Sequence, residues 1–156
     1  MLNYNDIQKI KKETEEFFKK MDIEVELDFL PQREETLPVN LKTAEPQILI
    51  GEGGQTLVEI QRLLKVILKR KIATAGEPFY IDLDINNYKK KKNEYLKELA
   101  HSTADEVALI KKEMALTPMS PYERRIIHLE LADRPDITTE SIGDEPERRV
   151  VIKPYP

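Results

Sequence analysis

The chain has 156 residues, enough for one compact domain or two small ones, and 40% of them are hydrophobic. It contains no cysteine and only two histidines, which excludes a disulfide framework and argues against a metal centre or a metal cofactor. The opening residues are too polar and acidic for a signal or transit peptide, and no apolar run is long enough for a transmembrane segment, so we expect a cytoplasmic protein.

The net charge of −4 is unevenly distributed along the chain. Residues 1–60 carry 7 basic and 13 acidic side chains, residues 61–128 carry 14 and 9, and residues 129–156 carry 4 and 7. A basic middle between acidic ends is compatible with one positive face that binds an anionic polymer. A surface covered by ion pairs is the alternative, and composition alone favours that alternative.

The first half of the chain has the periodicity of a small α+β unit. Helices are predicted over about residues 3–20 and 57–70, and strands over about residues 23–29, 39–43 and 79–85. The two helices are amphipathic, and the strands alternate apolar and polar residues, as half-buried strands do. The predicted order of elements is therefore α-β-β-α-β.

The second half begins with a long helix after Asn86-Asn87, which we interpret as a helix cap. Its buried stripe is predicted to run from Leu96 through Ile110 to Met114, and Pro118 ends the helix. We expect two domains, at residues 1–86 and 87–156.

A shorter helix and two strands complete the second half. Ser120, Pro121 and Glu123 have the spacing of a capped helix start, with serine at the cap and glutamate three residues later. Strands are predicted at about residues 137–141 and 148–153, joined by a turn that contains Gly143 and Pro146.

A G-x-x-G loop, Gly51-Glu52-Gly53-Gly54, lies between an apolar run and the second predicted helix. Glycine lets one backbone approach another without a Cβ in the way, and the following helix presents free N–H groups to a phosphate. The pattern predicts a clamp for the sugar-phosphate backbone of a single strand, with a plain turn as the alternative. The carboxylate of Glu52 would repel phosphate, so we expect this loop to bind weakly by itself.

Arg124 and His128 are four residues apart and therefore share one face of the shorter helix. A guanidinium can hold a phosphate, and an imidazole can donate a further hydrogen bond or stack on a base. Arg148, Arg149 and Lys153 on the closing strand would extend this positive surface, and Arg125 lies on the same helix as the pair. A surface pair or a structural hydrogen bond is the alternative at this spacing.

Lys89 and Lys90 begin a run of four lysines at the start of the long helix. Its place between the two predicted domains suits a rail that follows a nucleic-acid backbone, although such a run also occurs as a solvated helix face. Asp82 and Asp84 share one strand face without a third ligand, so we expect a structural role for them.

Several stretches resemble the bacterial Jag (KhpB) family, in which a KH domain precedes an Arg-x-x-x-His domain. The similar stretches are residues 49–57, 82–88, 96–100, 118–128 and 139–152, within an overall resemblance over about residues 22–154. The resemblance implies that the first domain is KH-like and the second is a small α/β Arg-x-x-x-His domain, both for single-stranded nucleic acid. It makes residues 51–54 the KH loop, and Arg124 and His128 the signature pair.

The family resemblance also carries expectations about cellular role. Its members resemble RNA chaperones and regulators, and a small single-KH protein is an implied partner. The sequence departs from the family at two points. Glu52 occupies a position that is usually basic in the family, and the family's extra N-terminal domain has no counterpart in this sequence.

The sequence therefore predicts a protein that binds single-stranded RNA, or single-stranded DNA, through two grooves and performs no catalysis. A second hypothesis is a protein-interaction module, whose KH groove or acidic strand at residues 24–28 holds a protein partner. A third is an enzyme with His128 and Glu123 or Glu130 as acid and base. No activated nucleophile, metal set or phosphate-binding P-loop accompanies them in the sequence.

Overall fold

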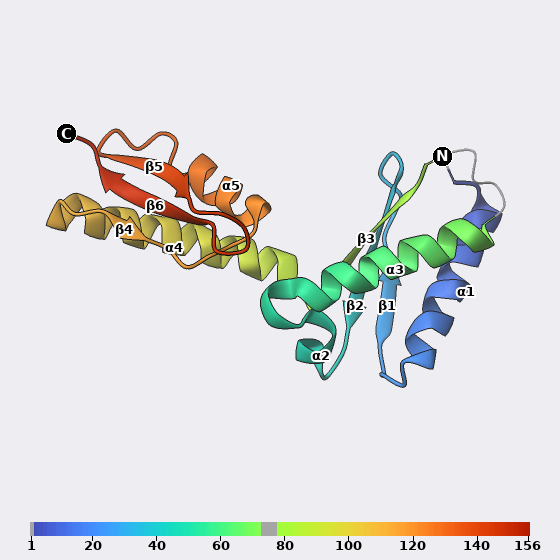
Figure 1. Cartoon of the computed structure of the whole chain (residues 1–156). Helices are drawn as coiled ribbons and strands as arrows, with labels where there is room; N and C mark the ends of the chain where they lie inside the picture. The colour runs from blue at the N-terminus through green and yellow to red at the C-terminus, as the bar shows by residue number, and fades with distance from the viewer. Residues whose placement is uncertain (1, 73–77) are drawn as a thin grey trace. The chain divides into compact units, whose positions relative to one another are not determined.

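The computed structural model describes residues 2–72 and 78–156, and the chain divides into two compact units. The first unit is Met1–Lys89 and the second unit is Lys90–Pro156 (Figure 1). Each has its own hydrophobic core and its own three-stranded sheet, so the mixed α+β class expected from the sequence is confirmed. No helix in the described ranges is both long and apolar enough to cross a membrane.

The first unit has the predicted order of elements with one addition. Its helices are α1 (Tyr4–Lys20), α2 (Pro46–Ile50) and α3 (Gln55–Lys71), and its strands are β1 (Glu26–Phe29), β2 (Thr36–Lys42) and β3 (Tyr80–Ile85). β2 is the central strand, antiparallel to β1 and parallel to β3. The addition is α2, a short helix with Pro46 in its first turn, where proline is well tolerated.

Helices α1 and α3 pack on the apolar face of this sheet. Alternate side chains of β2 and β3 point into the core, as the pleat of a strand requires. Figure 1 shows α3 crossing in front of the strands. The fully buried residues include Ile10, Phe18, Leu37, Val39, Leu41, Leu64, Leu68, Leu83 and Ile85. The first unit thus holds the G-x-x-G loop on a packed scaffold.

The junction after β3 differs from the predicted helix cap. The side-chain amide of Asn86 accepts from the N–H of Thr43 at 3.0 Å and donates to its carbonyl oxygen at 2.9 Å, so it ties β3 to the loop after β2. Asp84 instead accepts the N–H of Lys89 in the first turn of the next helix, at 3.0 Å. Of the two residues of the predicted cap, Asn86 therefore uses its side chain elsewhere.

The second unit packs two helices on an antiparallel sheet. Its elements are α4 (Tyr88–Ile110), which begins in the first unit, β4 (Met114–Ala115), α5 (Pro121–Glu130), β5 (Ile137–Ile142) and β6 (Arg149–Pro154). β6 lies between β4 and β5. The predicted capping box is confirmed, since Ser120 Oγ accepts from the N–H of Glu123 at 3.3 Å and Glu123 Oε2 accepts from the N–H of Ser120 at 2.8 Å.

The predicted stripe of the long helix is too long at its C-terminal end. The buried residues of α4 are Leu96, Ala100, Thr103, Ala104 and Val107. Ile110 is 44% exposed, and Lys111 adopts a φ of 57°, which ends the helix. Met114 lies instead in β4, opposite Ile152 of β6.

We expect Gly51→Ala to destabilise the first unit strongly. Gly51 has φ 72° and ψ −175°, a region almost exclusive to glycine, and a Cβ would lie 2.0 Å from Thr56 Oγ1. Urea unfolding followed by circular dichroism should show a loss of about 3 kcal/mol.

Gly53→Ala is the matched control in the same loop. Gly53 also has a positive φ, 59°, but no atom lies within 4 Å of a Cβ built there. The cost should be only about 1 kcal/mol, that of the left-handed backbone alone. Equal losses in the two variants would contradict the steric explanation.

Candidate nucleic-acid interface

The local structure requires glycine at two positions of the G-x-x-G loop, Gly51 and Gly54. Gly51 ends α2, and a 3-10 turn at Glu52–Gly54 leads into α3. A Cβ on Gly54 would lie 3.0 Å from the hydroxyl oxygen of Tyr88, so this glycine allows the first residue of α4 to pack against the loop. The conformation of the loop is therefore restricted at both Gly51 and Gly54.

The start of α3 presents backbone donors beside this loop. Its N-cap is Gly54, and no side chain makes a capping hydrogen bond there. Glu52 and Gly53 are exposed. A helix start of this kind favours an anion, through its N–H groups and the helix dipole, whereas the Glu52 carboxylate opposes one. The arrangement suits weak phosphate binding.

Arg124 is buried in α5, with only 8% of its surface exposed. Its Nη1 donates to the carbonyl oxygen of Met119 at 2.7 Å, and its Nη2 lies 2.8 Å from Oε1 of Glu145, in the connection between β5 and β6. The sequence suggested an open guanidinium, but its donors already have an internal acceptor and a counter-ion. A phosphate that binds Arg124 would compete with the half-exposed Glu145 carboxylate.

His128 lies one turn further along α5, between two hydroxyl groups of β5. Its Nδ1 is 2.7 Å from Thr139 Oγ1, and its Nε2 is 2.8 Å from Ser141 Oγ. Thr139 and Ser141 pair with the buried Ile152 and Val150 of β6, so they occupy the core-facing side of β5. The strand pairing therefore sets the position of both hydroxyls beside the imidazole.

The imidazole of His128 is held in its neutral form at neutral pH. Burial lowers its pKa below the usual value of 6.5, and the charge of Arg124 lowers it further. A neutral imidazole has one donor and one acceptor nitrogen, which two hydroxyl groups can satisfy. His128 thus contributes hydrogen bonding rather than positive charge.

Arg148 and Arg149 make their contacts with residues at the end of β5 and in the β5–β6 connection. Arg148 donates to the carbonyl oxygens of Gly143 and Ser141 at 3.1 and 3.5 Å. Arg149 donates to the carbonyl oxygen of Glu147 at 3.2 Å, and its Nη2 is 3.5 Å from the Glu147 carboxylate. Both side chains support the β5–β6 connection.

The remaining predicted cations differ in their pairing. Lys89 forms an ion pair with Asp82, and Asp84 accepts backbone N–H groups, so both aspartates have the structural role that we expected. Arg125 and Lys90 are exposed, and neither makes a hydrogen bond or an ion pair with any residue that the structure describes.

The predicted site residues fall into two groups, one in each unit. Arg124, His128 and Arg148 meet around the end of β5, whereas residues 51–54 belong to the first unit. The sequence did not identify Ser141 or Glu145 as their partners. A polar residue at a core-facing strand position was the available signal for Ser141, while the contact of Glu145 depends on tertiary structure.

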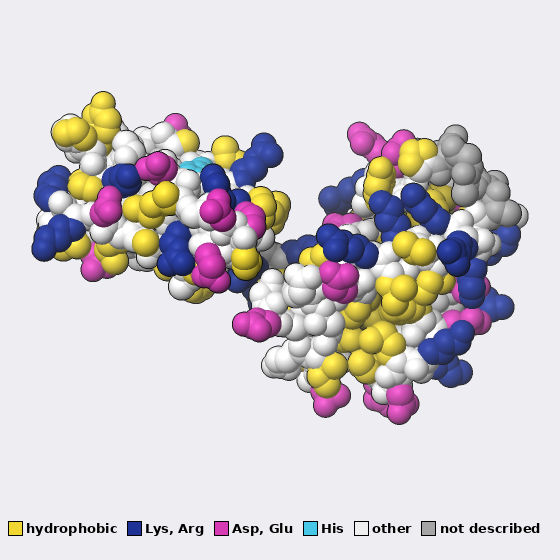
Figure 2. Space-filling model, in the orientation of Figure 1, with side chains coloured by type: hydrophobic (Ala, Val, Ile, Leu, Met, Phe, Trp, Pro, Cys, Tyr) yellow, Lys and Arg dark blue, Asp and Glu magenta, His cyan; other side chains and the backbone are white. Residues whose placement is uncertain are grey.

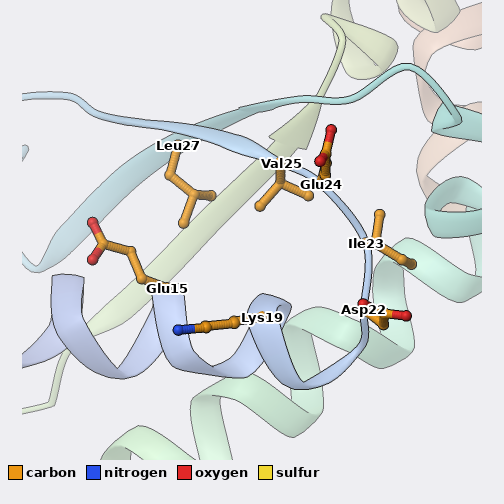
Figure 3. A pocket seen from close by; sticks show the side chains of 7 residues that line it. All are labelled: Glu15, Lys19, Asp22, Ile23, Glu24, Val25 and Leu27. Carbon is orange, nitrogen blue, oxygen red and sulfur yellow. The ribbon is translucent and has the colours of Figure 1, made fainter.

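An acidic pocket of about 410 Å³ lies between α1 and β1 (Figure 3). Its lining residues are Glu15, Lys19, Asp22, Ile23, Glu24, Val25 and Leu27. The three carboxylates outnumber the single ammonium, and Leu27 of β1 and the preceding Val25 point toward α1. This combination does not suit a phosphate. Within the described ranges, no cluster of acidic or histidine side chains could hold a metal ion.

Comparison with known proteins identifies the class of the second unit. Residues 94–154 match the R-three-H domain family, the family of Arg-x-x-x-His domains, which defines the class of the second unit. The chain is 38% identical over 132 residues to RNA-binding protein KhpB of Clostridium symbiosum, covering 85% of this chain and 57% of that protein. It is 37% identical over 114 residues to RNA-binding protein KhpB of Lactiplantibacillus plantarum, covering 73% of this chain and 34% of that protein.

A third relative, RNA-binding protein KhpB of Bacillus subtilis, is 33% identical over 123 residues, which is 78% of this chain and 58% of that protein. The chain belongs to the KhpB family, as the resemblance predicted. The matched region spans between about a third and somewhat more than half of the length of these relatives. The KH character of the first unit stays a prediction.

We expect His128 to make the second unit less stable in acid. Its pKa is lower in the folded chain than in the unfolded chain, so protonation favours unfolding. This contribution to stability should fall as the pH drops through about 6.5 and level off below the folded pKa.

The variant His128→Gln isolates this effect, because glutamine forms hydrogen bonds but does not titrate. The free energy of unfolding, measured between pH 7.5 and 5, should decrease less steeply in the variant than in the wild type. Two parallel pH profiles would exclude His128 as the titrating group.

Proposed function

We propose that the protein binds single-stranded RNA through its Arg-x-x-x-His domain and its G-x-x-G loop, as a chaperone or regulator without a catalytic step. The observation that carries this proposal is the placement of Arg124 and His128 on one face of α5, inside the segment that matches the R-three-H family. Relatives over most of the chain are named RNA-binding proteins, which favours RNA over single-stranded DNA. A cytoplasmic location is part of the same proposal.

The first unit contributes, on this proposal, as a KH-like domain over about residues 1–86, followed by the Arg-x-x-x-His domain over residues 87–156. Support comes from the order of elements and from the glycine loop that leads into α3. KH loops clamp about four nucleotides of backbone. Two weak sites on one chain raise the apparent affinity through effective concentration, and backbone contacts give only modest sequence preference.

A protein-interaction role is the second candidate, favoured by one specific observation. The pocket between α1 and β1 has an acidic rim and an apolar floor, which suits a basic protein segment better than RNA. The small single-KH protein implied by the family resemblance is the partner that we propose for this role. Partners that remain bound after nuclease treatment in a pull-down would support this role.

We expect Glu52→Lys to strengthen RNA binding. The change removes a repulsive carboxylate beside the start of α3 and adds a cation, which should tighten binding about fivefold at low salt. The dependence of affinity on salt should become steeper by about one to two counter-ions. Fluorescence anisotropy with a labelled 12-nucleotide RNA at two salt concentrations measures both quantities.

Glu34→Lys is the matched control, because Glu34 is exposed in the connection between β1 and β2 and the change in net charge is the same. An equal gain in both variants would mean that only the overall charge matters and that residues 51–54 are not a binding site.

We expect Glu145→Gln to tighten RNA binding if Arg124 contacts phosphate. Glutamine keeps the shape and can still accept from Nη2 of Arg124, but it removes the negative charge that competes with a phosphate, so affinity should rise about threefold to tenfold. Arg124→Ala and His128→Ala should both weaken binding. Asp144→Asn, in the same exposed connection, is the control of equal charge change. If both neutralising variants behave alike, Arg124 is not the phosphate ligand.

A further inference from the structure

Helix α5 carries an exposed stripe beside the Arg124–His128 pair. Tyr122 and Leu129 are each 65% exposed, and Arg125 is also exposed. Residues three and four apart lie on one face of a helix, so these three side chains follow one another along the solvent side. Arg124 and His128 point instead toward Glu145 and the hydroxyls of β5.

Arg125 is a positively charged and exposed side chain, as a phosphate contact requires. The neighbouring Arg124 is buried and already has a carboxylate as its counter-ion. Arg125 makes no hydrogen bond or ion pair with the part of the chain that the structure describes. A phosphate can therefore bind Arg125 without displacing an internal partner.

A second exposed tyrosine lies near this stripe, in the first half of α4. Tyr95 is 56% exposed, and the Lys92 ammonium is 5.8 Å from the centre of its ring. Lys92 is also 3.4 Å from the Glu123 carboxylate, and Asn93 Nδ2 is 3.5 Å from the hydroxyl of Tyr122. These contacts bring the exposed rings of Tyr95 and Tyr122 and the ammonium of Lys92 to one region of the second unit. Figure 2 shows hydrophobic and basic side chains side by side near α5.

We propose that Tyr122 stacks on an unpaired base of the bound strand and that Arg125 binds the phosphate of the same or the adjacent nucleotide. Exposed aromatic rings beside cations are the means by which proteins hold single strands without reading a fixed sequence. Arg124 and His128 hold α5 against β5 and the β5–β6 connection, so they position the helix that carries these two contacts. This inference rests on the proposed function and identifies the residues through which the same site meets its ligand.

The chain contains no tryptophan, so Tyr122→Trp introduces a single fluorescent reporter at the proposed stacking position. Titration with a 12-nucleotide RNA should quench its emission, whereas an abasic strand of equal length should not. Tyr155→Trp is the control, because Tyr155 is 59% exposed and lies beyond β6. Equal quenching at both positions would overturn the proposal.

Affinity measurements separate the two contacts. Tyr122→Ala should weaken RNA binding about tenfold with little change in salt dependence, since stacking is not ionic. Tyr122→Phe keeps the ring and should bind like the wild type. Arg125→Ala should reduce the salt dependence by about one counter-ion. An unchanged affinity for Tyr122→Ala, together with weaker binding by Arg124→Ala, would overturn this inference and leave the proposed function standing. A wild-type protein that does not bind RNA would overturn both.

Discussion

The buried guanidinium of Arg124 is the constraint around which the second unit is organised. A buried cation is costly unless hydrogen bonds and a counter-charge compensate it, and here Met119 and Glu145 supply them. The contact joins the start of α5 to the β5–β6 connection, and the N–H of Met119 donates to the carbonyl oxygen of Arg148 at 3.1 Å. Phosphate binding at Arg124 is therefore an exchange of one anion for another. The net gain from such an exchange is smaller than that of phosphate meeting an open cation.

The other residues of the two motifs are also engaged in contacts within the protein. His128 is satisfied by Thr139 and Ser141, and the close contacts at Gly51 and Gly54 explain those glycines without a ligand. The motifs that identify this family thus specify how the scaffold is built. The ligand surface is better located by exposed side chains that have no internal partner, because only these are available at no cost to the fold.

The local patterns of the sequence predicted most of the fold, and the failures share a physical cause. Alternation predicted β3, and the spacing of Ser120 and Glu123 predicted the start of α5. The short helix α2 was not distinguished, because periodicity cannot separate a five-residue helix from a strand. β4 exists only through its pairing with β6, and the role of Asn86 depends on Thr43, distant in the sequence. The Arg124–Glu145 contact was missed for the same reason, since tertiary structure creates it.

On the proposed function, the pairing of charges explains how an acidic chain binds an anionic polymer. Its net charge is −4, and several of the cations predicted to bind phosphate already have carboxylate partners. Within the described residues, Arg125, Lys90 and Lys91 are exposed cations without such partners. Each phosphate neutralised on a single strand contributes only about 0.7 to the salt exponent, so a few free cations supply a small electrostatic share of the affinity. On the proposal that Tyr122 stacks on a base, stacking and hydrogen bonding supply most of the remainder, and this exposed ring matters more than it would on a strongly basic protein.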